Sequence, residues 1–99
     1  RPFNNYGPHQ NAFEFAGIIP IVINNILKGK NITINGDGNQ TRDYIYVKDT
    51  ARAFVAAYES KMSRGEIINI ASGKEISINE LVQLIIKIMG NLSQKILFI

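Results

Sequence analysis

The sequence predicts an α/β chain, a mixed α+β fragment in which short strands alternate with helices. Three observations indicate this class. Apolar residues recur at helical spacing in three segments, short β-branched runs lie between these segments, and Gly- and Asn-rich turns separate the runs. We expect one domain over residues 1–99, because no linker or change in composition marks a boundary within this length.

The first half of the chain is predicted to hold a loop, a helix and a strand. Residues 1–12 are rich in Asn, Gly and Pro, which is typical of an irregular loop. A helix fits residues 20–28, because its proline suits a first helical turn and the glycine after it can end it. Residues 32–34 predict a short strand, and residues 36–39 predict a tight turn because Gly and Asn tolerate positive φ.

The middle of the chain is predicted to form a strand, a helix and a second strand. Residues 43–47 read as a strand, and Asp49 is a suitable N-cap for the next helix. Residues 66–70 predict the second strand. The apolar stripe expected on the helix consists of Ala51, Phe54, Val55 and Tyr58.

The last helix has the clearest boundaries in the sequence. Ser77 and Glu80 form a capping-box pattern at its start, and Gly90 is expected to end it. A terminal strand is expected within residues 95–99. The residues that this helix is expected to bury are Leu81, Leu84, Ile85 and Ile88.

The composition argues against several classes of function. The net charge of +3 comes from scattered basic residues, whereas a nucleic-acid binder concentrates them in a stripe. Without cysteine, and with His9 as the only histidine, the chain offers no metal cluster. The longest apolar run, residues 18–23, is far too short to span a bilayer. We therefore expect no nucleic acid, no metal and no membrane.

No arrangement of nucleophile, base and orienting group is evident, so we assign no catalytic residue. Asp37, Asp43 and Asp49 favour a turn, a strand-end contact and a helix cap over a general-acid pair. His9 favours a surface position. The turn at residues 36–38 favours a hairpin-type turn over a phosphate loop, because it leads into a strand and not into a helix.

Two polar residues leave alternatives open. Arg42 offers a planar fork for phosphate oxygens, but an ion pair with Asp43 or a surface position is the simpler role. Asn4 could bind a phosphate or hydroxyl of a ligand, although stabilising a turn is the simpler role.

Two separated signatures resemble a known family. RPFNNYGP at 1–8 and GDGNQTRDYIYVKDTARAF at 36–54 are similar to paired motifs in the C-terminal half of extended short-chain dehydrogenases/reductases, the NAD-dependent epimerase/dehydratase family. Residues 18–34 and 66–85 fit the same pattern, so the match covers nearly the whole chain up to Gly90. The resemblance implies the C-terminal, nucleotide-sugar-binding portion of such an enzyme, with the Rossmann core missing.

The resemblance also implies roles for individual substrate-binding residues. Asn4 and Arg42 would bind the substrate phosphates. Thr33 and Asn35 would border the base and ribose, and Ile19 would line the substrate side. The ligand implied is a nucleoside-diphosphate sugar.

The cofactor implied is NAD or NADP, bound mainly by the missing N-terminal part, with the backbone of Pro2 and Phe3 close to the nicotinamide. No glycine-rich dinucleotide fingerprint is present. Tyr44 and Lys48 have the family's Tyr-x-x-x-Lys spacing, but they are predicted on a strand entering a helix, whereas the family's motif lies on a helix further upstream. We therefore expect the isolated chain, which looks truncated at both ends, to be inactive.

The function implied is the substrate-binding part of a sugar-nucleotide 4-epimerase. The alternatives are part of a 4,6-dehydratase, or a non-catalytic nucleotide-sugar-binding remnant. The resemblance further implies a cytoplasmic parent enzyme that forms a homodimer.

Overall fold

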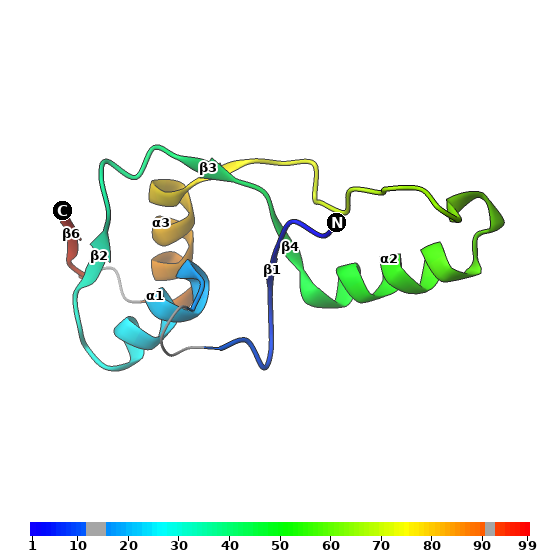
Figure 1. Cartoon of the computed structure of the whole chain (residues 1–99). Helices are drawn as coiled ribbons and strands as arrows, with labels where there is room; N and C mark the ends of the chain where they lie inside the picture. The colour runs from blue at the N-terminus through cyan, green and yellow to red at the C-terminus, as the bar shows by residue number, and fades with distance from the viewer. Residues whose placement is uncertain (12–15, 91–92) are drawn as a thin grey trace. The chain divides into compact units, whose positions relative to one another are not determined.

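Short strands and helices are mixed along the chain, as the sequence predicts, in a computed structural model that describes residues 1–11, 16–90 and 93–99 (Figure 1). The chain divides into two compact units, each assembled from two separate stretches of sequence. Unit 1 consists of residues 1–9 and 43–75, and unit 2 consists of residues 10–42 and 76–99.

Unit 1 is built on parallel strand pairing. Strand β1 (Asn4–Tyr6) pairs in parallel with β4 (Tyr44–Tyr46), and helix α2 (Val47–Glu59) comes directly after β4. A short 3-10 helix, η1 (Lys61–Ser63), comes after α2. Just before β1, Pro2 forms an isolated parallel bridge with Ile70. The segment at residues 1–6 therefore pairs with two other segments, where an irregular loop was predicted for residues 1–12.

Three predictions for unit 1 need correction. Helix α2 begins at Val47 with Tyr46 as its N-cap, so Asp49 is not the N-cap; it lies in the first turn and forms an ion pair with Arg52. An acidic side chain there still faces the positive end of the helix dipole. The strand predicted at residues 66–70 is reduced to the single bridge at Ile70. The predicted strand at 43–47 ends at Tyr46, because Val47 already adopts helical geometry.

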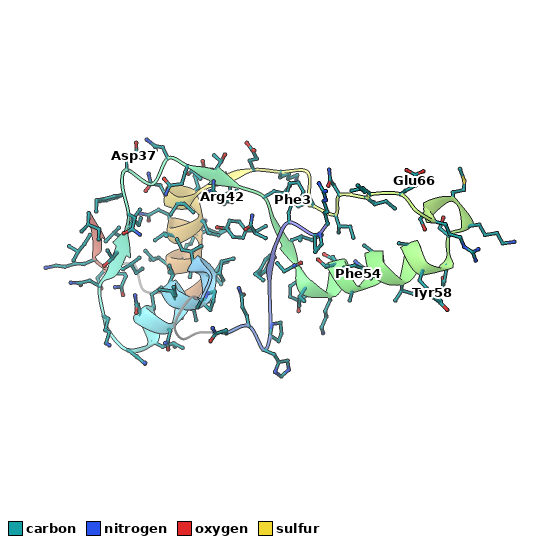
Figure 2. All side chains as sticks on the ribbon, in the orientation of Figure 1. Phe3, Asp37, Arg42, Phe54, Tyr58 and Glu66 are labelled. Carbon is teal, nitrogen blue, oxygen red and sulfur yellow. The ribbon has the colours of Figure 1, made fainter. Side chains whose placement is uncertain are left out.

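The apolar stripe of α2 is exposed. Phe54 and Tyr58 are 54% and 92% accessible, and Figure 2 shows both side chains on this helix. Val55 and Ala51 are exposed as well. In unit 1 the only buried hydrophobic side chain among the described residues is Ile45, with Thr50 as the buried polar one. The amphipathic pattern of α2 thus has no covering partner within unit 1.

Unit 2 contains nearly all of the core. Helices α1 (Ile18–Leu27) and α3 (Ile78–Met89) pack together beside β2 (Ile32–Ile34), which pairs in parallel with β6 (Ile96–Phe98). Strand β3 (Thr41–Arg42) pairs antiparallel with β5 (Ile76–Ser77). The buried hydrophobic residues of this unit are Val22, Ile26, Ile32, Ile34, Ile78, Leu81, Val82, Ile85 and Ile86.

Both predicted ends of α3 are confirmed. Ser77 is the N-cap and its Oγ accepts a hydrogen bond from the Glu80 N–H, while Gly90 ends the helix with φ 73°. The predicted buried face is only partly right, because Leu84 and Ile88 are exposed and Val82 and Ile86 are buried in their place. The stripe that meets α1 is therefore rotated from the predicted one.

The start of α1 and the type of turn after β2 also differ from prediction. Helix α1 begins at Ile18, which places Pro20 within the first turn, where its missing N–H costs no hydrogen bond. The turn at residues 36–39 forms with positive φ at Gly36 and Gly38. It does not close a hairpin, because β2 pairs with β6 and β3 pairs with β5.

Candidate functional site

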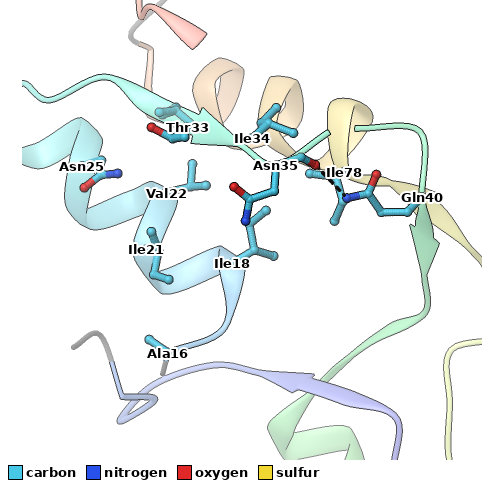
Figure 3. A pocket seen from close by; sticks show the side chains of 11 residues that line it. Ala16, Ile18, Ile21, Val22, Asn25, Thr33, Ile34, Asn35, Gln40 and Ile78 are labelled. Carbon is cyan, nitrogen blue, oxygen red and sulfur yellow. Dashed lines mark hydrogen bonds between the residues drawn. The ribbon is translucent and has the colours of Figure 1, made fainter. Parts of the chain in front are cut away.

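A pocket of about 250 Å³ opens in unit 2 between α1, β2 and the turn after β2 (Figure 3). Its floor is formed by core side chains, among them Val22, Ile32 and Ile34, which are fully or almost fully buried. The complete lining consists of Ala16, Ile18, Ile21, Val22, Asn25, Ile32, Thr33, Ile34, Asn35, Gln40 and Ile78.

Polar side chains surround this apolar floor. Thr33, Asn35, Gln40 and Asn25 all line the pocket, and the Gln40 Nε2 donates a hydrogen bond to the Asn35 carbonyl oxygen at 3.4 Å. Amide side chains both donate and accept hydrogen bonds. An apolar floor with a few polar groups at the edge is the usual composition of a small-molecule pocket.

The structure brings two sequence-predicted residues together at this pocket. Both line it: Thr33 lies on β2, and Asn35 comes directly after β2. Ile18 lines it as well, whereas its neighbour Ile19 is half-buried and is not among the lining residues. Sequence reasoning missed Gln40, which comes to the pocket only because the turn at 36–39 folds the chain back.

Arg42 lies on β3, opposite Ile76 of β5 (Figure 2). Its side chain is exposed, and its Nη1 donates a hydrogen bond to the carbonyl oxygen of Thr41 at 2.7 Å. A guanidinium carries five N–H donors, so most of its donor capacity faces solvent. The geometry therefore leaves a charged fork available to an anionic group.

The other predicted residues lie in unit 1. The Asn4 Nδ2 donates a hydrogen bond to the Asp43 carbonyl oxygen at 3.2 Å, which leaves its second amide hydrogen and its Oδ1. Phe3 is exposed, and its backbone N–H donates to the Ile70 carbonyl oxygen at 2.9 Å next to the bridge at Pro2. The predicted site residues are thus divided between the two units.

Asp43 forms the strand-end contact that the sequence favours. Its carboxylate accepts hydrogen bonds from the Ser72 N–H at 2.8 Å, the Ser72 Oγ at 2.7 Å and the Gly73 N–H at 2.9 Å. These donors, the Ser72 N–H first, lower the pKa of Asp43 from its ordinary value because they stabilise the charged form. The carboxylate is therefore engaged in holding residues 72–73.

Tyr44 and Lys48 have the placement that the sequence predicts. Tyr44 lies on β4 and Lys48 in the first turn of α2, so the pair does not lie along one helix. No group of three metal-ligating side chains exists within residues 1–11, 16–90 and 93–99. Over the same ranges, none of the helices combines the length and apolar character needed to cross a bilayer.

Comparison with known proteins defines the family. The model of the NAD dependent epimerase/dehydratase family matches residues 1–71, which is more than half of the chain. The chain therefore belongs to this NAD-dependent family, as its two signatures predict.

Individual relatives are nucleotide-sugar enzymes. The chain is 48% identical to a putative UDP-glucose 4-epimerase of Methanocaldococcus jannaschii, over 83% of this chain and 26% of the relative. The structure of the UDP-glucose 4-epimerase of Thermotoga maritima with UDP-glucose superposes with a TM-score of 0.93 at 34% identity, over 100% of this chain and 31% of that one. The NAD complex of dTDP-glucose 4,6-dehydratase from Bacillus anthracis gives a TM-score of 0.89 at 33% identity, over 100% and 30%. The chain thus spans between a quarter and a third of these relatives' lengths.

Proposed function

We propose that this chain is the nucleoside-diphosphate-sugar-binding part of an NAD-dependent sugar-nucleotide 4-epimerase. The observation that carries the proposal is the pocket of unit 2, which has an apolar floor and amide groups at its edge. The family to which the chain belongs makes a nucleotide sugar the expected ligand. The 48% identity to the putative UDP-glucose 4-epimerase supports an epimerase, whereas the solved epimerase and dehydratase structures, at 34% and 33% identity, do not separate the two activities.

Each predicted residue has a role in this proposal. Thr33 and Asn35 border the base and ribose at the pocket, and Ile19 belongs to the substrate side of α1. Arg42 presents its exposed guanidinium to the diphosphate. A planar guanidinium binds phosphate oxygens in a bidentate manner, and such charge-assisted bonds are among the stronger hydrogen bonds in proteins.

The residues of unit 1 have roles toward both the substrate and the cofactor. The free amide hydrogen of Asn4 donates to a substrate phosphate, and the backbone of Pro2 and Phe3 lies close to the nicotinamide. NAD or NADP, when bound by the remainder of a complete enzyme, supplies the hydride chemistry at the sugar C4. This chain contributes binding and orientation of the substrate. We further propose that the complete enzyme is a cytoplasmic homodimer.

A chimera tests the substrate-binding role. This chain replaces the matching 31% of the Thermotoga maritima epimerase, and the conversion of UDP-glucose to UDP-galactose is measured with added NAD. We expect turnover by the chimera and none by this chain alone, which has neither the dinucleotide fingerprint nor the Tyr/Lys pair on a helix. A folded chimera without turnover, or turnover by the chain alone, would contradict the proposal.

Nucleotide preference separates the epimerase from the dehydratase. The chain is titrated with uridine diphosphate (UDP) and with thymidine diphosphate, and binding is monitored through the backbone amide NMR signals of the pocket residues Thr33, Asn35 and Gln40. Preference for UDP is the result expected of the UDP-sugar epimerase, and preference for thymidine diphosphate would favour a dTDP-glucose 4,6-dehydratase in its place. Binding of UDP by the chain together with an inactive, well-folded chimera would favour the non-catalytic binding module.

A further inference from the structure

The turn at residues 36–39 is fastened to helix α3 by one side chain. The Asn79 Nδ2 donates hydrogen bonds to the Asp37 carbonyl oxygen at 2.9 Å and to the Asn39 Oδ1 at 3.3 Å. The backbone N–H of the same residue donates to the Gly38 carbonyl oxygen at 3.0 Å. Within the turn, the Asn39 N–H donates to the Asp37 Oδ1 at 2.9 Å. Asn79 thus contacts three consecutive residues of the turn.

The fit between the turn and this side chain is close. Gly38 is buried at φ +75°, and a Cβ at this position would lie 2.1 Å from the Asn79 Oδ1. No real Cβ tolerates such a distance, so a side chain at residue 38 would displace Asn79. Positive φ independently favours glycine at this position. The turn and Asn79 are therefore packed as one element.

This anchor precedes the segment that carries Arg42. The Gln40 carbonyl oxygen accepts a hydrogen bond from the Ile78 N–H at 3.0 Å, and Thr41 and Arg42 then pair with Ser77 and Ile76. A ladder of two residue pairs is short, and isolated two-stranded pairings are only marginally stable in water. A side chain that holds the preceding turn therefore raises the fraction of time that this strand stays in place.

The helix itself does not need the Asn79 side chain. The start of α3 is satisfied by Ser77, whose Oγ accepts the Glu80 N–H and donates to the Glu80 Oε1. Both hydrogen bonds of the Asn79 side chain go to the turn instead. Asn is also a weaker helix former than Ala. The hydrogen bonds of the Asn79 side chain thus stabilise the turn, and through the turn strand β3. The helix start has its own side-chain cap in Ser77, although the Gly38 and Gln40 carbonyl oxygens also accept hydrogen bonds from the Asn79 and Ile78 N–H groups.

We propose that Asn79 is a positioning residue, which holds the turn so that Arg42 on β3 and Gln40 at the pocket edge stay in place for the nucleotide diphosphate. This inference rests on the proposed function of the pocket and of Arg42. An anchor of this kind acts on affinity through the fraction of molecules in the competent arrangement, because the apparent dissociation constant is the intrinsic one divided by that fraction.

The experiment compares three variants of the full chain. Asn79→Ala removes both side-chain hydrogen bonds to the turn. Asn79→Asp removes the amide donor but places a negative charge in the first helical turn, where it favours the helix. Ser77→Ala is the matched control, because it weakens the start of the same helix and leaves the turn contacts intact. UDP affinity is measured by NMR titration, stability by urea unfolding, and local opening by exchange of the Asn39 amide hydrogen.

We expect both Asn79 variants to weaken UDP binding about tenfold, which corresponds to a tenfold smaller fraction of molecules in the binding-competent arrangement. The Asn39 amide should exchange faster in both. Ser77→Ala should lower the urea midpoint with UDP affinity unchanged in the folded protein. Asn79→Ala is decisive, because Ala favours the helix, removes both hydrogen bonds to the turn and adds no charge that could itself repel a diphosphate.

Two results would overturn the positioning role alone. In the first, Arg42→Lys binds UDP more weakly than the wild-type chain, which shows that Arg42 takes part in binding, but both Asn79 variants keep the wild-type affinity. The other is an equal loss of affinity in Ser77→Ala, which would show that only helix stability matters. Absence of UDP binding to the wild-type chain would instead refute the proposed function, and the positioning role with it.

Discussion

Replacing Arg42 by Lys tests whether its guanidinium binds a diphosphate or only braces the chain. Lysine keeps the positive charge but loses the planar fork that can donate two parallel hydrogen bonds. In the unliganded structure this guanidinium is exposed and donates to the carbonyl oxygen of Thr41, its own neighbour in sequence. The substitution therefore removes few hydrogen bonds from the unliganded protein, but it removes a bidentate contact to a bound phosphate.

The expected magnitudes are set by these contacts. A hydrogen bond to a charged group contributes about 1.5–3 kcal/mol, so the loss of one of a bidentate pair should weaken UDP binding about tenfold or more. Substitution of an exposed residue with so few contacts should change the free energy of unfolding by less than about 0.5 kcal/mol. Affinity and stability should thus respond differently to Arg42→Lys.

Isothermal titration with UDP alongside a thermal melt measures both quantities. Arg52→Lys is the matched control, because Arg52 is also exposed but pairs with Asp49 on α2. We expect unchanged UDP affinity in this control. Unchanged affinity in a folded Arg42→Lys chain would refute the phosphate assignment. A lowered melting temperature with normal affinity would show that Arg42 is structural.

Three further predictions concern stability and association. In urea unfolding, Ile86→Ala should cost about 2–5 kcal/mol because this side chain is buried, whereas Ile88→Ala, on the exposed face of the same helix, should cost less than about 0.5 kcal/mol; equal costs would contradict the observed packing of α3. The lowered pKa of Asp43 means that its contribution to stability is complete above pH 3.8, its ordinary pKa, and is lost as the pH falls through the lower folded-state value. In Asp43→Asn this acid-sensitive part of the unfolding profile should disappear, and its persistence would argue against the hydrogen bonds from residues 72–73. Phe54→Ser should reduce self-association in sedimentation experiments, because it interrupts the exposed apolar stripe of α2; an unchanged sedimentation profile would show that other surfaces associate.

The elements that the sequence predicted best are fixed by local interactions. Both ends of α3 are determined by Ser77, Glu80 and Gly90, whose effects depend only on neighbours within one turn. The predictions that failed depend on distant residues. The buried face of α3 is set by its contact with α1, and residues 66–70 have the composition of a strand but pair only through Ile70. Periodicity alone contains no information about these partners.

The site shows the same division between local and distant effects. The resemblance assigned roles to Thr33 and Asn35, on either side of Ile34, and the structure places both at the pocket. Gln40 and Asn79 lie within segments that match the family, but the resemblance assigned neither of them a role. Gln40 reaches the pocket through the fold of the turn, and Asn79 contacts a turn some 40 residues earlier in the sequence.

Binding and stability are linked in unit 2 because the pocket floor belongs to the core. Val22, Ile32 and Ile34 line the pocket and are among the most completely buried side chains of the described chain. Substitution of any of them by a smaller residue creates a cavity and lowers stability whether or not a nucleotide binds there. Loss of binding in such a variant therefore carries no information about recognition. Arg42 lies outside this floor and is exposed, so substrate recognition can be measured there separately from folding.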